Sequence, residues 1–145
     1  MLPLPGNAGR EDLRRVWVLA WQKARERLPM TPLEAMLTDV LHLHPEYQGL
    51  LEDPDALAKE WTPEGGGTNP FLHMGLHMAL REGIASDRPQ GLRELYDRLR
   101  CSRDAHAAEH LLMECLAETL WEAERAGLPP DESAFLARAH RAAGG

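Results

Sequence analysis

The chain has 145 residues, of which 43% are hydrophobic and 27% are charged, and its formal net charge is −7. This length and composition are typical of one globular domain and differ from those of disordered chains. The acidic balance argues against nucleic acid as a partner, because neutralising phosphates requires excess Lys and Arg. The chain contains one Ile and three Val against many Leu and Ala, which favours helices over strands.

Membrane association and disulfide bonds are not expected. No apolar run reaches the roughly 18 residues of a membrane span, and the start, MLPLPGNAGREDLRR, lacks the apolar stretch of a secretory signal. Cys101 precedes a predicted helix that contains Cys115, so their Cα atoms should lie about 20 Å apart, too far for a bridge. We therefore expect a cytoplasmic protein with reduced thiols. A homo-oligomer or another protein stays open as a partner.

The first predicted elements are two helices. Apolar residues recur at helical spacing over residues 11–28, which predicts the first helix. Its basic residues are interpreted as a solvated face. They are Arg10, Arg14, Arg15, Lys23, Arg25 and Arg27. Thr31 and Glu34 fit a capping box with Pro32 at the first helical position, so a second helix should begin there and end before Pro45.

Prolines and glycines organise the middle of the chain. Pro45 and Pro54 are each expected to open a short helix, and a glycine-rich flexible linker is predicted over residues 62–68. Asn69 and Pro70 then form a strong helix start. The segment that follows, FLHMGLHMALREGI, is apolar around most of its circumference apart from its histidines and its charged end.

Three more helices complete the prediction. A short one is expected over residues 89–100, and Ser102 or Arg103 should begin a longer one that Gly127 closes as its C-cap. Asp131 fits the N-cap of the last helix. The sequence thus predicts an all-α fold, a single-domain bundle of five to seven helices over residues 1–145. Residues 1–10 and 142–145 are expected to be frayed.

Four of the seven histidines form two pairs with the same spacing, His73 with His77 and His106 with His110. Four residues along an α-helix rotate by about 400° and rise by about 6 Å, so both rings of a pair project from one face. Helix-borne zinc ligands use this spacing. Glu114 follows His110 by one further turn. If the two helices pack together, four imidazoles and a carboxylate meet in the interior.

The predicted metal ligands are therefore His73, His77, His106, His110 and Glu114, and the predicted ion is iron or zinc. A buried histidine can instead hydrogen-bond a carbonyl or carboxylate nearby. Separate partners for four buried rings would require many hydrogen bonds, however, and each unsatisfied polar group costs about 1–3 kcal/mol. One shared ion would satisfy all four rings.

His44 and Glu46, in the string HLHPEY, are further candidates at a helix boundary. There the chain can turn inward and supply a ligand or a residue that orients one. The alternative is a capping residue followed by an acidic residue that the helix dipole favours. His42 and His140 are interpreted as solvent-facing.

The strings LHLHPEY, NPFLHMGLHMALRE, DRPQG and AEHLLMECLAETLWEAERAG resemble those of a bacterial family described as domain of unknown function 1841. The resemblance spans residue 33 to the end of the chain. It implies no activity, because none is established for the family. The positions that match its motifs are His44, Glu46, Asn69, Pro70, His73, His77, His110 and Glu114.

Two other groups resemble parts of the pattern. The spacings of His73 with His77 and of His110 with Glu114 are similar to the HxxxH and HxxxE pairs that hold two irons in hemerythrin-type bundles, although those proteins place the HxxxE pair first. Separately, the string from His106 through Glu109 to His110 is similar to the HxxEH string of inverted zinc peptidases, where the glutamate is the general base.

Three functions are consistent with these patterns. The first is a metal-binding protein holding iron or zinc, such as a non-haem metal oxidoreductase. The second is a metal-free interaction module in which the histidines are polar core groups and the basic first helix or the tryptophans meet a partner protein. These tryptophans are Trp17, Trp21, Trp61 and Trp121. The third is a small zinc hydrolase.

Overall fold

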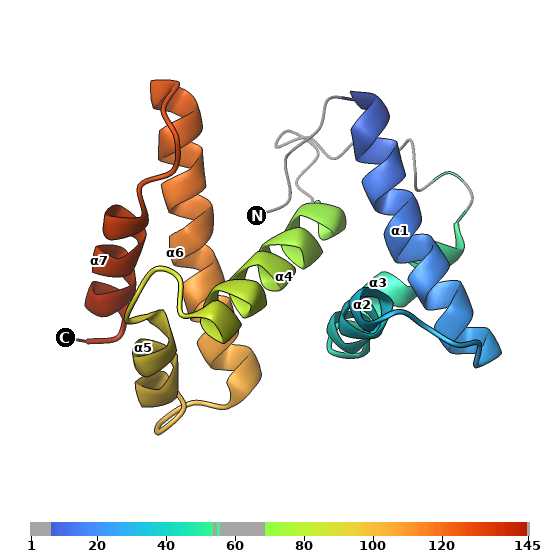
Figure 1. Ribbon diagram of the computed structural model, residues 1–145, viewed down its shortest axis with the longest axis horizontal. Coiled ribbons are helices and arrows are strands. Elements are labelled where there is room, and N and C mark those ends of the chain that lie inside the picture. Colours follow the sequence, from blue (N-terminus) through green and yellow to red (C-terminus); the bar gives the residue numbers. More distant parts are fainter. Residues whose placement is uncertain (1–6, 54, 56–68, 145) are drawn as a thin grey trace. The chain divides into compact units, whose positions relative to one another are not determined.

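The structure, a computed structural model, describes residues 7–53, 55 and 69–144. These residues form seven α-helices and one 3-10 helix, with no strand among them (Figure 1). The all-α fold class predicted from composition is confirmed. The helices are α1 (Asn7–Glu26), α2 (Pro32–His42), α3 (Pro45–Gln48), η1 (Leu50–Glu52), α4 (Pro70–Ser86), α5 (Leu92–Leu99), α6 (Ala105–Ala126) and α7 (Glu132–Ala142).

The chain divides into two compact units, residues 1–78 and 79–145. The boundary falls inside α4, so the first turns of this helix belong to one unit and its last turns to the other. The single-domain organisation expected from the sequence stays a prediction. The predicted helix at Pro54 and the predicted linker at residues 62–68 lie outside the described residues.

The first unit is built around the packing of α1 on α2 and η1, and of α2 on α3. Its apolar core draws one or more side chains from each of α1, α2, η1 and α4. The core residues are Trp17, Ala20, Leu37, Val40, Leu41, Leu51, Phe71 and Met74. Because these positions recur every three or four residues within α1, α2 and α4, each helix turns one apolar face toward the same interior.

The α1–α2 connection begins with a left-handed backbone residue and ends with a side-chain cap. Arg27 has a left-handed φ of 56°, which ends α1 at Glu26, two residues before the predicted end. The predicted capping box is confirmed: the Glu34 amide donates to the Thr31 hydroxyl at 3.1 Å, and the Thr31 amide donates to the Glu34 carboxylate at 2.9 Å. These bonds satisfy amides that the first turn of a helix leaves without intrahelical partners.

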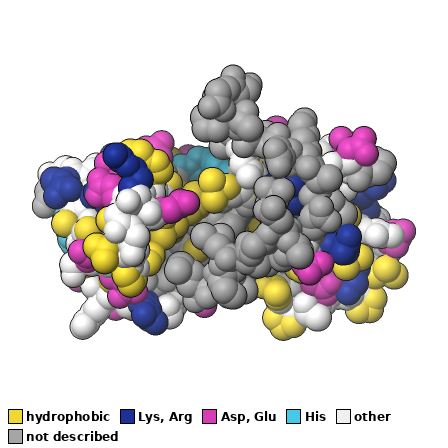
Figure 2. Space-filling model, turned by 90° about the horizontal axis from the view of Figure 1, so that it is seen from above, with side chains coloured by type: hydrophobic (Ala, Val, Ile, Leu, Met, Phe, Trp, Pro, Cys, Tyr) yellow, Lys and Arg dark blue, Asp and Glu magenta, His cyan; other side chains and the backbone are white. Residues whose placement is uncertain are grey.

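The basic residues of α1 are largely paired rather than forming a cationic surface. Lys23 lies 2.8 Å from Glu34, and Arg25 lies 3.0 Å from Glu52. Arg14 departs from the predicted solvated face, because it is only 2% exposed. Lys, Arg, Asp and Glu side chains are interspersed on the face drawn in Figure 2.

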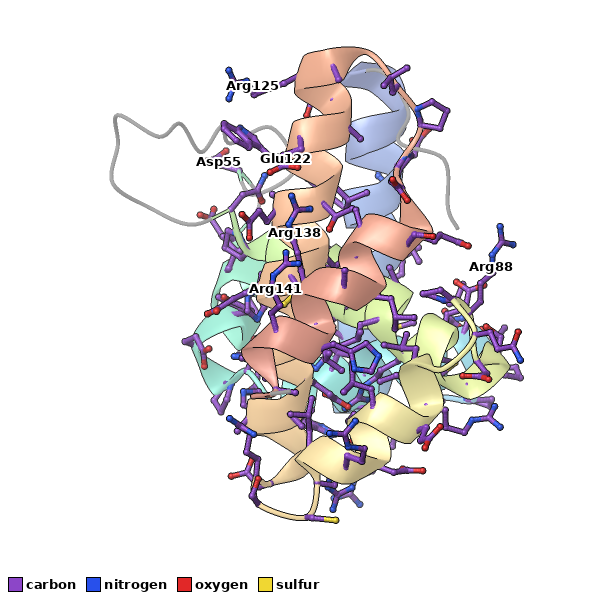
Figure 3. The ribbon with its side chains drawn as sticks, turned by 90° about the vertical axis from the view of Figure 1, so that its left-hand side faces the viewer. Asp55, Arg88, Glu122, Arg125, Arg138 and Arg141 are labelled. Carbon is purple, nitrogen blue, oxygen red and sulfur yellow. The ribbon has the colours of Figure 1, made fainter. Side chains whose placement is uncertain are left out.

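The second unit packs α5, α6 and α7 against one another. Arg138 of α7 joins α6 through an ion pair with Glu122, beside which it lies in Figure 3. It also donates to the Thr119 hydroxyl at 2.9 Å. The buried apolar residues of this unit are Leu80, Leu92, Leu95, Leu99, Ala108, Leu112, Met113, Cys115, Phe135 and Ala139.

Two predicted helix starts in the second unit were wrong, while two of its caps were predicted correctly. Helix α5 begins at Leu92 rather than at Pro89, because the Asp87 carboxylate accepts the Gly91 and Arg93 amides and holds the residues between as a turn. Helix α6 begins at Ala105 rather than near Ser102, since the Asp104 carboxylate accepts the Ala107 amide at 2.7 Å. Gly127 and Asp131 occupy the predicted cap positions.

The tryptophans differ in exposure. Trp17 is buried and Trp21 packs beside it at the edge of the first core, whereas 56% of Trp121 is exposed. Trp61 lies outside the described residues. Among the helices that the structure describes, none has the length and apolar character needed to cross a membrane.

A close approach of backbone to α4 yields a prediction about two glycines. A Cβ at Gly83 would lie 2.8 Å from the Arg88 carbonyl oxygen and 3.2 Å from Leu92, whereas a Cβ at Gly75 would have nothing within 4 Å. We expect Gly83→Ala to destabilise the fold by about 1–3 kcal/mol through overpacking. Gly75→Ala should stabilise it by about 0.5–1 kcal/mol through the better helix propensity of alanine.

Urea unfolding of both variants measures the difference. The two substitutions make the same chemical change in the same helix, so Gly75→Ala is the matched control. Equal stabilisation by both would contradict the steric argument.

Candidate metal centre

Three histidines of the first unit lie close together. His44 comes from the turn between α2 and α3, and His73 and His77 come from α4. One ligand nitrogen of each lies within 4.8 Å of those of the other two. His44 is 2% exposed and His77 is 0% exposed, while His73 is half-buried. The three rings therefore form a largely desolvated cluster.

His44 is oriented by the end of α2. Its Nδ1 donates a hydrogen bond to the Val40 carbonyl at 2.8 Å. Because a neutral imidazole carries one proton, this bond leaves the lone pair of Nε2 available as an acceptor or ligand. That Nε2 lies 3.1 Å from Nε2 of His73.

The local sequence explains the turn at His44. A proline disfavours helical geometry in the residue before it, and His44, which precedes Pro45, has φ −129° and ψ 70°. The Leu43 and His44 amides donate to the Val40 and Leu41 carbonyls at 3.1 Å, and two side chains add a second bond to each of these carbonyls. The His44 ring donates to the Val40 carbonyl, and the Gln48 side-chain amide donates to the Leu41 carbonyl at 3.1 Å.

His73 and His77 project from one face of α4, as their spacing predicts. Their ring centroids are 6.1 Å apart, and those of His44 lie 4.8 Å from His73 and 5.1 Å from His77. The Asn69 side chain caps the start of α4 by accepting the Phe71 amide at 3.0 Å. Helix geometry thus fixes the spacing of the pair, and the α2–α3 turn brings the third ring to it.

Tyr47 of α3 borders the cluster. Its ring is nearly parallel to that of His44, with an interplanar angle of 9° and centroids 5.2 Å apart, and its centroid is 5.7 Å from that of His73. Burial raises the pKa of the Tyr47 phenol, and the neighbouring Glu46 carboxylate raises it further. The phenol therefore stays protonated at neutral pH.

The other predicted site residues are either half-buried or exposed. His106 and His110 are half-buried on α6 in the second unit, with ring centroids 4.0 Å apart. Glu114 and Glu46 are exposed. Of the two solvent-facing histidines expected from the sequence, His42 is exposed and His140 is half-buried.

The second unit also contains a buried ion pair, between Glu109 and Arg81, that the sequence analysis did not predict. Glu109 is 5% exposed, and its carboxylate oxygens lie 3.3 and 3.4 Å from guanidinium nitrogens of Arg81. Its only signal in the sequence is its place in the string from His106 to His110. A guanidinium that contacts both oxygens compensates the charge of this buried carboxylate.

The two cysteines allow a test of the second unit. Both are free thiols, and Cys101 is exposed whereas Cys115 is buried. Burial, followed by the Glu118 and Glu114 carboxylates, raises the pKa of Cys115 above its ordinary value. At pH 8 we therefore expect a thiol reagent such as dithionitrobenzoate to react quickly with Cys101 and slowly with Cys115, whose thiolate fraction is small.

The measurement is the number of thiols modified with time, and Cys101→Ser should remove the fast phase. The Cys115 rate should rise as the pH is raised toward its pKa. Two thiols reacting at one rate in the native protein would contradict the burial of Cys115.

Comparison with known proteins supports the resemblance noted in the sequence. A family model described as Domain of unknown function (DUF1841) matches residues 9–141, a span that includes every predicted site residue. Searches of curated proteins and of solved structures found no match. Because the family model covers most of its length, the chain belongs to the DUF1841 family.

Proposed function

We propose that this protein binds a transition-metal ion, iron or zinc, through His44, His73 and His77. The observation that carries the proposal is the orientation of His44, whose Nδ1 donates to the Val40 carbonyl. Histidines that bind metals almost always use their second nitrogen in this way, because the hydrogen bond fixes the tautomer and directs the free lone pair.

The distance between two of the donor atoms supports a shared ion. Two nitrogens bound to one ion at about 2.0–2.1 Å, with an angle of 90–110° between the bonds, lie about 2.9–3.4 Å apart. The Nε2 atoms of His44 and His73 are 3.1 Å apart. His77, fully buried, offers a third nitrogen within 4.8 Å of both.

The chemistry of the donors favours iron or zinc. Imidazole is a good ligand for Zn, Fe, Cu and Ni, whereas Mg and Ca prefer oxygen. If these three histidines are the complete set of protein ligands, a coordination position is left for water or substrate, as catalytic sites require. With iron, such a position suits a non-haem oxidoreductase, and with zinc it suits a hydrolase.

The metal-free interaction module stays the alternative, and a specific distance favours it. A separation of 3.1 Å also fits an N–H···N hydrogen bond in which His73 donates to His44. In that case the cluster is a polar part of the core. Metal analysis separates the two functions directly.

The first test is the metal content of protein purified without a histidine tag. We expect about one iron or zinc per chain, with substitution of His44, His73 or His77 by alanine lowering metal affinity at least tenfold. His42→Ala is the matched control, because His42 is exposed and only two residues from His44. Metal-free protein that gains no metal on titration would refute the proposal.

The variants His106→Ala, His110→Ala and Glu114→Ala extend the same titration to the second unit. Their role as ligands stays a prediction from the sequence. Loss of affinity in His110→Ala would include that pair in the metal site, and unchanged affinity in all three would exclude it.

Thermal stability provides a second test. A ligand that binds only the folded state stabilises it by about 2.7 kcal/mol when its free concentration is 100 times Kd. For a chain of this size we expect the addition of the metal to raise Tm by roughly 5–10 °C. The rise should be absent in His77→Ala and preserved in His42→Ala, as measured by differential scanning calorimetry.

A further inference from the structure

The Tyr47 ring contacts His44, one of the proposed metal ligands. His44 is the one histidine of the cluster that is supplied by a turn rather than by α4. A ligand on a turn has fewer backbone restraints than one in a helix interior, so its orientation depends on its contacts.

The hydrogen bond of His44 leaves one motion unrestrained. With Nδ1 held by the Val40 carbonyl and Nε2 directed at His73, the ring keeps its in-plane direction. It can still tilt about the axis that joins the two nitrogens. The Tyr47 ring, within 9° of parallel and 5.2 Å away between centroids, blocks that tilt on one face.

Tyr47 is itself held in place. Its amide donates to the His44 carbonyl at 2.9 Å, and its neighbour Gln48 ties α3 to the Leu41 carbonyl. The Tyr47 centroid also lies 5.7 Å from that of His73, in an edge arrangement with an interplanar angle of 68°. The tyrosine ring therefore contacts two of the three proposed ligands from a fixed position.

Stacking also favours the metal-bound form of His44. A cation bound at Nε2 draws electrons from the imidazole, and the electron-rich face of a tyrosine attracts a ring that has become more positive. The interaction is thus stronger with metal than without it.

We propose that Tyr47 is a positioning residue that fixes the plane of the His44 imidazole and thereby raises the affinity of the His44–His73–His77 site for its metal ion. This inference rests on the proposed function. It assigns to the aromatic face of Tyr47 a role that the three ligands do not supply.

The test is a double-mutant cycle read out by titration with Co²⁺, whose visible absorption reports the ligand geometry, and with Zn²⁺ in competition. Tyr47→Leu should lower affinity about 10-fold or more, as is typical when a residue that orients a ligand is lost. Tyr47→Phe keeps the aromatic face and should bind as the wild type does. In a His44→Ala background, Tyr47→Leu should have no further effect.

The possible outcomes separate a failure of the proposed metal site from a failure of the role of Tyr47. Wild-type protein that binds neither ion would refute the proposed function and this inference with it. Wild-type binding with an equal affinity in Tyr47→Leu, or an equal loss in the His44→Ala background, would refute the role of Tyr47 alone. A loss in Tyr47→Phe would instead assign the effect to the hydroxyl and overturn the stacking argument.

Circular dichroism checks that Tyr47→Leu is folded. If it is not, Tyr47→Met, which keeps apolar bulk without an aromatic face, takes its place. A Tyr47→Met variant that binds Co²⁺ as tightly as Tyr47→Phe, with the same absorption spectrum, would overturn the proposal.

Discussion

The imidazole of His44 donates its Nδ1 proton to the Val40 carbonyl at 2.8 Å, and the rest of the histidine cluster depends on this bond. The Val40 carbonyl also accepts the Leu43 amide at 3.1 Å, so the ring adds a second bond at the end of α2. This bond also determines which nitrogen of the ring faces His73. The His44 side chain thus bonds to the end of α2 through Nδ1 and directs Nε2 into a buried region, where polar groups need partners.

The same device recurs through both units, where side chains complete the backbone at helix ends. Thr31 with Glu34, Asn69, Asp104 and Asp131 each accept amides at a helix start. Such bonds define where one helix stops and another begins. In the first unit this shapes the candidate site, because the turn at His44 brings a third ring to a pair already placed by α4.

The two histidine pairs have identical spacing and belong to different units. His73 and His77 share their surroundings with a third imidazole and an aromatic ring, and His77 is completely buried. His106 and His110 flank Glu109, whose carboxylate faces the Arg81 guanidinium. Within its own unit, the first pair has a further imidazole beside it, and the second pair neighbours the Arg81–Glu109 ion pair. Only the first is proposed here as a metal site on structural grounds.

Much of the architecture could be read from the sequence because it is local. The helical class follows from the scarcity of β-branched residues, and the caps at Thr31 and Asp131 follow from side chains that bond to amides two or three residues away. The starts of α5 and α6 were misplaced. Several neighbouring polar residues could cap each helix, and the folded backbone determines that the Asp87 and Asp104 carboxylates accept the amides.

The candidate site divides in the same way. The spacing of His73 and His77 determined that both rings share a face of α4, because helix geometry alone requires it. The sequence offered His44 only as one candidate at a helix boundary and gave no signal for Tyr47. Their approach to α4 joins residues about 30 positions apart, and such contacts depend on how the α2–α3 turn packs in three dimensions, which no local pattern encodes.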